Sequence, residues 1–141
     1  HTAPINMIYG LHESLRVALT EGLDQRFARH RRVSAGLRAG LLELGLGLPV
    51  AESDRLPQLT LVSVPEGIDE ARVRHFLLRE HGVEIGGGLG DFAGKAWRIG
   101  MMGSGCTEEN AVRCIKGLSA ALQDQGAPLT DAEGAVRVAF S

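Results

Sequence analysis

The segment EIGGGLGDFAGKAWRIGMMG, residues 84–103, places a glycine-rich stretch directly before an apolar run that holds a single arginine, Arg98. Side chains alternate in character along AWRIGMM, and a period of two residues predicts a β-strand. Trp97 and Ile99 then share one face of this strand, and Arg98 lies on the opposite face beside Gly100. If the tryptophan face packs under helices, the arginine points away from the core.

Two interpretations of Arg98 stay open from this pattern. A guanidinium next to a glycine has room for a planar partner that accepts two parallel hydrogen bonds, such as a carboxylate. An arginine is also common on the solvated face of an antiparallel sheet, where it binds nothing. Periodicity alone favours the second interpretation.

The glycines themselves formally match a nucleotide-binding pattern. Residues 88–93, GLGDFA, fit G-x-G-x-x-A. A dinucleotide fingerprint has to lie between a strand and a helix, whereas this one precedes a strand. The context therefore argues against a dinucleotide site. It favours a tightly turning connection, or a backbone that something else approaches closely.

Composition and charge restrict the class of protein. The chain has 141 residues, of which 44% are hydrophobic, and a formal net charge of −2, which is typical of one globular domain. The charge gives no basic surface for nucleic acid or an anionic membrane, and no apolar run is long enough to span a bilayer. Two cysteines without a CxxC spacing favour a reducing, cytoplasmic setting. The five histidines have no metal-ligand spacing, so no metal site is expected.

The order of secondary-structure signals predicts an α+β fold. The expected elements, in chain order, are a helical region at 4–46 that is kinked or divided at Gly22, a strand within 57–65, a helix at 68–82, an extended piece at 83–85, a strand at 96–102, a helix at 106–126 and a weak edge strand at 135–140. This order predicts helices covering one face of a small, mainly antiparallel sheet, with a ferredoxin-like arrangement as the nearest template. The basic stretch RFARHRR, residues 26–32, is expected to be a solvated helix face.

Three stretches together resemble a known family. They are HTAPINMIYGLHESLRVALTEGL at the start, LPQLTLVSVPEG in the first strand, and the run from Val83 to Asn110 with its GGLG, GKAWRIG and MMG elements. In this combination they resemble class V pyridoxal-phosphate-dependent aminotransferases of the alanine–glyoxylate and serine–pyruvate type. The resemblance extends to about Gln125, and the tail after Gly126 departs from it.

The resemblance implies that this chain is a C-terminal portion, because it begins with histidine where the family's large domain has just ended. Residues 1–47 would form interdomain or interface helices, and residues 48–141 the small α+β domain of a type I fold. Pyridoxal 5'-phosphate would bind mainly to the upstream large domain, which is absent from this chain. The parent enzyme would be a homodimer that moves an amino group from alanine or serine to glyoxylate or pyruvate.

The resemblance also implies roles for two residues. Arg98 matches the arginine of the RIG element that binds the α-carboxylate of small amino-acid and keto-acid substrates. Thr2 matches the threonine of the HT.P element that reaches the cofactor phosphate of the partner subunit. Neither Lys95 nor Lys116 matches the lysine that holds the cofactor covalently, so no catalytic residue is expected here and the chain alone should be inactive.

A second class of protein stays open. The chain could be a free-standing ferredoxin-like module that binds a small ligand or a partner protein and catalyses nothing, because it contains no complete catalytic set. The long N-terminal helical region argues against this alternative, since a self-contained module has nothing for such a helix to bridge.

Overall fold

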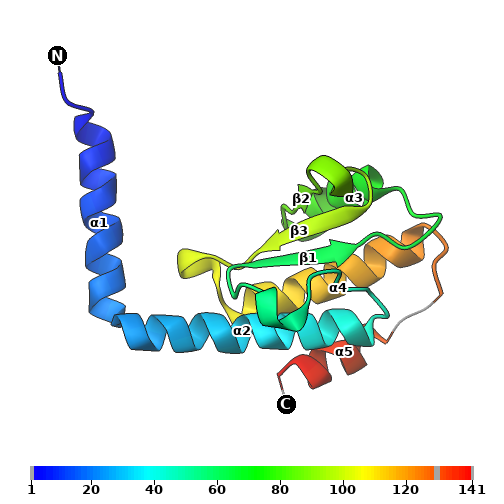
Figure 1. Cartoon of the computed structure of the whole chain (residues 1–141). Coiled ribbons are helices and arrows are strands. Elements are labelled where there is room, and N and C mark those ends of the chain that lie inside the picture. The colour runs from blue at the N-terminus through cyan, green and yellow to red at the C-terminus, as the bar shows by residue number, and fades with distance from the viewer. Residues whose placement is uncertain (1, 129–130, 141) are drawn as a thin grey trace.

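The protein is described by a computed structural model that covers residues 2–128 and 131–140. Its elements follow one another in the order helix, helix, strand, helix, strand, strand, helix, helix (Figure 1). The bounds are α1 Ile5–Glu21, α2 Leu23–Glu43, β1 Leu59–Ser63, α3 Glu70–His81, β2 Gly86–Gly87, β3 Ala96–Gly100, α4 Glu108–Asp124 and α5 Ala132–Ala139, with 3-10 turns at Glu52–Asp54, Gly90–Phe92 and Gly103–Gly105.

The strands form one antiparallel sheet in the order β1-β3-β2, with β3 at the centre. Arg98 stands opposite Leu61 on one side and Gly86 on the other. The predicted α+β fold with an antiparallel sheet is thus confirmed. The ferredoxin-like template fits in part, because the described residues supply three strands, and β2 begins one residue after the extended piece expected at 83–85.

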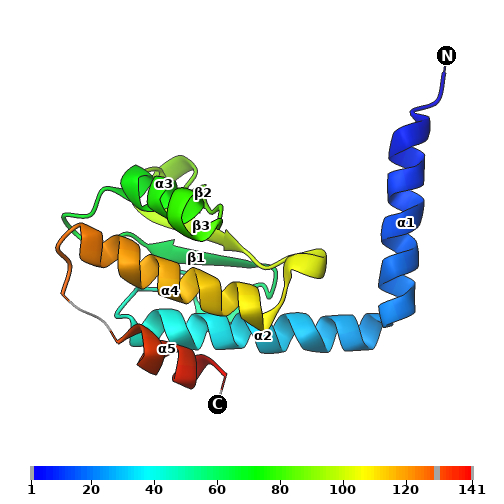
Figure 2. The same cartoon turned by 180° about the vertical axis from the view of Figure 1, so that it is seen from behind.

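The core lies between the sheet and the helices that cover one of its faces. Trp97 and Ile99 of β3 and Val62 of β1 are buried there, as the alternation predicted. The indole Nε1 of Trp97 donates a hydrogen bond to the carbonyl oxygen of Glu70, 3.2 Å away, which ties β3 to the start of α3. Figures 1 and 2 show α3 and α4 on this face, with α2 running beside α4.

Several helices begin or end at the capping residues that the sequence predicted. The carboxylate of Asp69 accepts hydrogen bonds from the backbone N–H groups of Ala71 and Arg72 at the start of α3. The hydroxyl of Thr107 does the same for Asn110 at the start of α4. Gly82 ends α3 with φ +62°, a backbone conformation that favours glycine.

The tail is a correction to the prediction. Residues 135–140 were expected to form an edge strand, but they lie in and after helix α5, which packs on α2. Ala135 and Ala139 are four residues apart and face inward together, which suits a helical period better than an alternating one. A Cβ on Gly36 of α2 would lie 2.5 Å from the carbonyl oxygen of Ala139, so the bare glycine permits this close contact.

The N-terminal helix stands apart from the rest of the molecule. Gly22 separates α1 from α2 with φ +85°, so the predicted break at this residue is confirmed. Helix α1 has no buried residue and leaves α2 at the bend (Figure 1). Among residues 2–128 and 131–140, no helix combines the length and the apolar composition that crossing a bilayer requires.

The basic stretch 26–32 is a second correction, because it is not simply a solvated face. His30 is buried, and the guanidinium of Arg29 reaches the loop that follows β3. Arg29 Nη1 donates to the carbonyl oxygens of Cys106, at 2.6 Å, and of Gly103, at 3.1 Å. The remaining nitrogens of Arg29 bind the carboxylate of Glu21 at the end of α1. One arginine therefore joins α1, α2 and this loop.

Candidate functional site

Arg98 occupies the middle of the central strand, on the face turned away from the covering helices. Its side chain is half-buried. The Nε atom donates a hydrogen bond to the carbonyl oxygen of Gly87, 2.7 Å away. This bond fixes the start of the guanidinium group against β2 and leaves the two terminal nitrogens for other partners.

The guanidinium of Arg98 packs directly against the backbone of Gly86. A Cβ built on Gly86 would lie 3.1 Å from Nη2 and 3.4 Å from Cζ of Arg98. Such distances are tighter than ordinary van der Waals contact, so any larger residue would push the guanidinium away. The absence of a side chain at Gly86 therefore lets β2 and the Arg98 side chain lie in close contact.

The terminal nitrogens of Arg98 have no acid beside them. Among the residues that the structure describes, no carboxylate forms an ion pair with Arg98, and its one hydrogen bond is the one to Gly87. A guanidinium in this state can grip an external carboxylate through two parallel N–H···O bonds.

Arg74 provides a direct contrast on the far side of the same glycine pair. Its Nε donates to Oε2 of Glu70 at 2.7 Å, and its Nη2 to Oε1 at 3.2 Å, so its guanidinium already has a bidentate carboxylate. The hydrogen bonds to Glu70 raise the pKa of Arg74. Two arginines thus flank β2, and of these two only Arg98 has no carboxylate partner among the described residues.

The glycine-rich connection between β2 and β3 is a compact turn. The N–H of Gly88 donates to the carbonyl oxygen of Ala96 at 2.7 Å, and that of Lys95 donates to the carbonyl oxygen of Phe92 at 3.0 Å. Gly90 and Gly94 both have positive φ, as a tight turn requires. The turn exposes Leu89 and Phe92 at its tip.

Thr2 lies far from Arg98 within one chain. It is exposed and precedes α1, whose 17 residues span about 25 Å at 1.5 Å per residue. Figure 1 shows the N-terminus at the distant end of this arm, away from β3. The structure does not bring the two residues together.

The lysine and cysteine side chains, all of which lie within the described residues, do not have the surroundings of a nucleophile or a covalent anchor. Lys95 is exposed, and the Nζ of Lys116 forms an ion pair with Glu133 at 2.7 Å. Burial raises the pKa of Cys114 to about 12 and also raises that of Cys106, so both remain thiols at neutral pH. The residues that the structure describes contain no cluster of three or more histidine, cysteine, aspartate or glutamate side chains placed to bind a metal ion.

The whole described fold is that of solved aminotransferases. The crystal structure of ureidoglycine–glyoxylate aminotransferase from Bacillus subtilis matches 99% of this chain with a TM-score of 0.93 and 42% identity, and the match covers 36% of that chain. The crystal structure of pyridoxamine–pyruvate aminotransferase from Mesorhizobium loti also matches 99% of this chain with a TM-score of 0.93, at 29% identity and again over 36% of that chain.

Named relatives agree with the structures. (S)-Ureidoglycine–glyoxylate transaminase of Bacillus subtilis is 45% identical over 122 residues, which are 86% of this chain and 29% of the relative. Alanine–glyoxylate aminotransferase of Felis catus is 41% identical over 124 residues, 87% of this chain and 30% of the relative. No protein-family model matches the sequence. The chain spans about a third of the length of these relatives, and its resemblance to class V aminotransferases is confirmed.

Proposed function

We propose that this chain is the substrate-gripping C-terminal part of a pyridoxal-phosphate-dependent aminotransferase that uses small keto acids such as glyoxylate or pyruvate as amino acceptors, with alanine or serine as donor. The observation that carries this proposal is Arg98, whose guanidinium is seated on Gly86 and has no carboxylate of its own among the described residues. The names of the relatives, glyoxylate and pyruvate aminotransferases, support the choice of acceptor.

Arg98 would bind and orient the substrate. A carboxylate that accepts two parallel hydrogen bonds from one fork is fixed both in position and in rotation about the bond to its α-carbon. The half-buried setting strengthens this contact, because fewer water molecules compete for the guanidinium. A compact keto acid needs little more than such a clamp on the side that this chain supplies.

The residues present fit the substrate side of the site better than the cofactor itself. When bound, pyridoxal phosphate supplies an electron sink for the α-carbon of the substrate. This chain offers it no desolvated lysine, since Lys95 is exposed and Lys116 is paired with Glu133. We therefore expect the chain alone to be inactive and to lose pyridoxal phosphate on dialysis; visible absorbance that survives dialysis would contradict this.

Thr2 would belong to a second subunit's site. Its hydroxyl is exposed at the free end of α1, a position from which a homodimer could present it to the cofactor phosphate of the partner. In this proposal residues 1–47 connect the large and small domains, and residues 48–141 form the small domain, with α2 packed on α4 and α5 as its foundation. Cofactor retention by a full-length Thr2→Val protein, followed during dialysis, tests the role of the hydroxyl.

The proposal predicts a large loss of activity when Arg98 changes. In the full-length protein, Arg98→Ala should lower kcat/KM for glyoxylate on the order of a hundredfold, because a bidentate charged contact disappears. Arg98→Lys should recover part of this loss, since the charge returns without the fork. Arg113→Ala, which breaks only an exposed ion pair with Glu109, is the control and should stay near the parent value. An unchanged kcat/KM for Arg98→Ala would remove Arg98 from the site and favour a non-catalytic binding module.

The two free cysteines support a reducing compartment such as the cytoplasm. Both are buried thiols, and neither is joined in a disulfide.

A further inference from the structure

A cavity of about 210 Å³ opens beside β1, and its lining contains neither Arg98 nor Gly86 and Gly87. It is bounded by the C-terminal half of α2, by the loop and 3-10 turn around residues 48–56, and by residues 59–61 of β1. Figure 1 shows this turn below β1 and in front of α2. The volume is sufficient for a small organic molecule and exceeds that needed by a single water.

Two polar side chains in the wall of this cavity lack partners. The hydroxyl Oγ1 of Thr60 and the Nη1 atom of Arg38 are shielded from solvent, and neither forms a hydrogen bond in the described part of the chain. Thr60 is only 4% exposed. A buried donor or acceptor without a partner destabilises the folded state, so folded proteins rarely leave two beside one cavity.

The positive charge of Arg38 is also not paired with a carboxylate among the described residues. Arg55 lies close enough for its positive charge to act on Arg38. Burial, and then the Arg55 charge, lower the pKa of Arg38, whereas Glu52 opposes this shift. Asp54 also lines the cavity, and Ser53 donates a hydrogen bond to its Oδ1 at 3.0 Å. This bond does not cancel the repulsion between Asp54 and an anion, so the carboxylate of a ligand has to lie on the Arg38 side of the cavity.

Arg55 lies in the same wall of the cavity but, unlike Arg38, forms a hydrogen bond there. Its Nε donates to the carbonyl oxygen of Val50 at 2.9 Å, a bond that closes the loop around the cavity. The chain therefore uses one arginine to build the cavity and leaves the other without a hydrogen bond inside it. This division of roles repeats the contrast between Arg74 and Arg98 at the first site.

The rest of the wall is apolar. Leu48 and Val50 come from the loop, and Leu56 and Leu59 stand at the rim with 62% and 38% of their surfaces exposed. Large exposed leucines beside a partly buried cation are the combination expected for a ligand that has one anionic group and an apolar body. An inorganic anion would leave the leucines uncovered.

We propose that this cavity binds a small aliphatic carboxylate, with its carboxylate group on the Arg38 guanidinium and the Thr60 hydroxyl and its alkyl chain against the leucines. The ligand supplies the partners that both side chains lack. Leu61 in the wall pairs with Arg98 across the sheet, but Arg98 does not line the cavity and its Nε is bound to Gly87 on the other side of β3, so this site is distinct from the proposed substrate clamp.

The test measures binding of 4-methylpentanoate by calorimetry to the full-length protein that carries this chain. The Arg98→Ala background removes the substrate clamp, so binding here is independent of the proposed function. We expect the neutral isostere 4-methylpentanamide to bind at least tenfold more weakly, because it cannot pair with a guanidinium. Acetate, which has the charge without the alkyl chain, should also bind more weakly.

Two variants test whether the ligand contacts Arg38 and Thr60. Arg38→Met should weaken binding on the order of a hundredfold, whereas Arg72→Met, which loses only an exposed ion pair with Asp124, should bind like its parent. Thr60→Val keeps the shape of the side chain and removes the unpartnered hydroxyl. It should weaken binding roughly tenfold while leaving the melting temperature unchanged or raised, a pair of effects that a purely structural hydroxyl would not produce.

Three outcomes would overturn the proposal. They are equal affinity for the acid and the amide, binding that Thr60→Val leaves intact, and a crystal structure of the full-length protein in which another segment of the chain fills the cavity. A crystal structure with the alkyl chain of 4-methylpentanoate between Leu48 and Leu56 would support it directly.

Discussion

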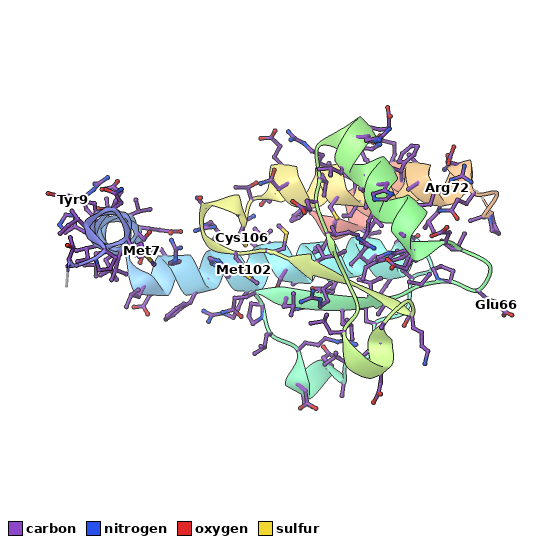
Figure 3. All side chains as sticks on the ribbon, turned by 90° about the horizontal axis from the view of Figure 1, so that it is seen from above. Met7, Tyr9, Glu66, Arg72, Met102 and Cys106 are labelled. Atoms are coloured by element: carbon purple, nitrogen blue, oxygen red, sulfur yellow. The ribbon has the colours of Figure 1, made fainter. Side chains whose placement is uncertain are left out.

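Helices α1 and α4 are both 17 residues long, yet α1 buries none of them and α4 buries eight. Composition does not explain this difference, because α1 carries large apolar residues throughout, including Met7, Tyr9 and Leu19, whose side chains are at least 70% exposed. Figure 3 looks along α1 and shows the side chains of Met7 and Tyr9 extending outward from it. Helix α4, in contrast, lies against α2, α3 and α5.

The comparison shows that an apolar stripe indicates which face of a helix can be buried. Whether that face is buried depends on the elements that pack against the helix. Ile8, Leu11 and Leu15 recur at helical spacing and are half exposed or more. Exposed apolar area of this extent marks an interaction surface. It fits the proposal that residues 1–47 connect to further parts of a larger protein, and it makes α1 and α4 a natural pair for mutation.

The largest contrast is expected from shortening one leucine in each helix. Leu118→Ala in α4 removes a fully buried side chain and should lower the free energy of unfolding of the 141-residue chain by about 2–5 kcal/mol. Leu11→Ala in α1, where the side chain is 59% exposed, should change it by less than about 0.5 kcal/mol. Urea unfolding followed by circular dichroism measures both. Similar losses would mean that α1 has a partner within this chain.

Glycine-to-alanine substitutions should change the stability in opposite directions in α1 and in α2. A Cβ on Gly36 of α2 would press against the backbone of α5, so Gly36→Ala should destabilise the fold by about 1–3 kcal/mol. A Cβ on Gly10 of α1 would meet nothing within 4 Å, so Gly10→Ala should stabilise its helix by about 0.5–1 kcal/mol through helix propensity. Thermal unfolding of both variants checks the signs, and a stabilising Gly36→Ala would disprove the tight packing of α5.

The smallest effect concerns the junction between α1 and the rest. Glu21 binds Arg29 and Arg26, and these hydrogen bonds hold the pKa of its carboxyl at about 2, below its ordinary value of 4.5. A depressed pKa adds stability that is present above pH 4.5 and is lost as the pH falls toward 2. Glu21→Gln should therefore loosen the bend at neutral pH, and its difference from the parent should shrink as the pH falls through 2 and vanish below it.

Electron paramagnetic resonance distances between a spin label on α1 and one on α4 report this bend. Glu13→Gln is the matched control, because Glu13 pairs only with Arg16 on its own helix and cannot affect the angle between helices. Equal distance distributions for Glu21→Gln and its parent at pH 7 would show that Gly22 alone sets the bend.

Only one feature of the candidate site, the position of Arg98, was predicted from the sequence. Alternation placed Arg98 on the face opposite Trp97, and the resemblance gave it a role, because both depend on neighbouring residues in the chain. The contact of Arg98 with Gly86 could not be predicted, because strand pairing joins these two positions, 12 residues apart, through a glycine loop. The pair between Glu70 and Arg74 is different, since these residues are four apart on one helix and their spacing is visible in the sequence. The contacts of Arg29 with Gly103 and Cys106 join residues more than 70 positions apart, and no local pattern signals them.

Local order determined much of this protein: the helical and alternating periods, the caps at Asp69 and Thr107 and the break at Gly22 all follow from interactions within about four residues. Tertiary structure alone decided that the tail is a helix on α2, that α1 stays uncovered, and that Arg38 and Thr60 meet one cavity without partners. The physical reason is that burial and polar pairing are set by groups distant in sequence, whose approach depends on the whole chain having folded.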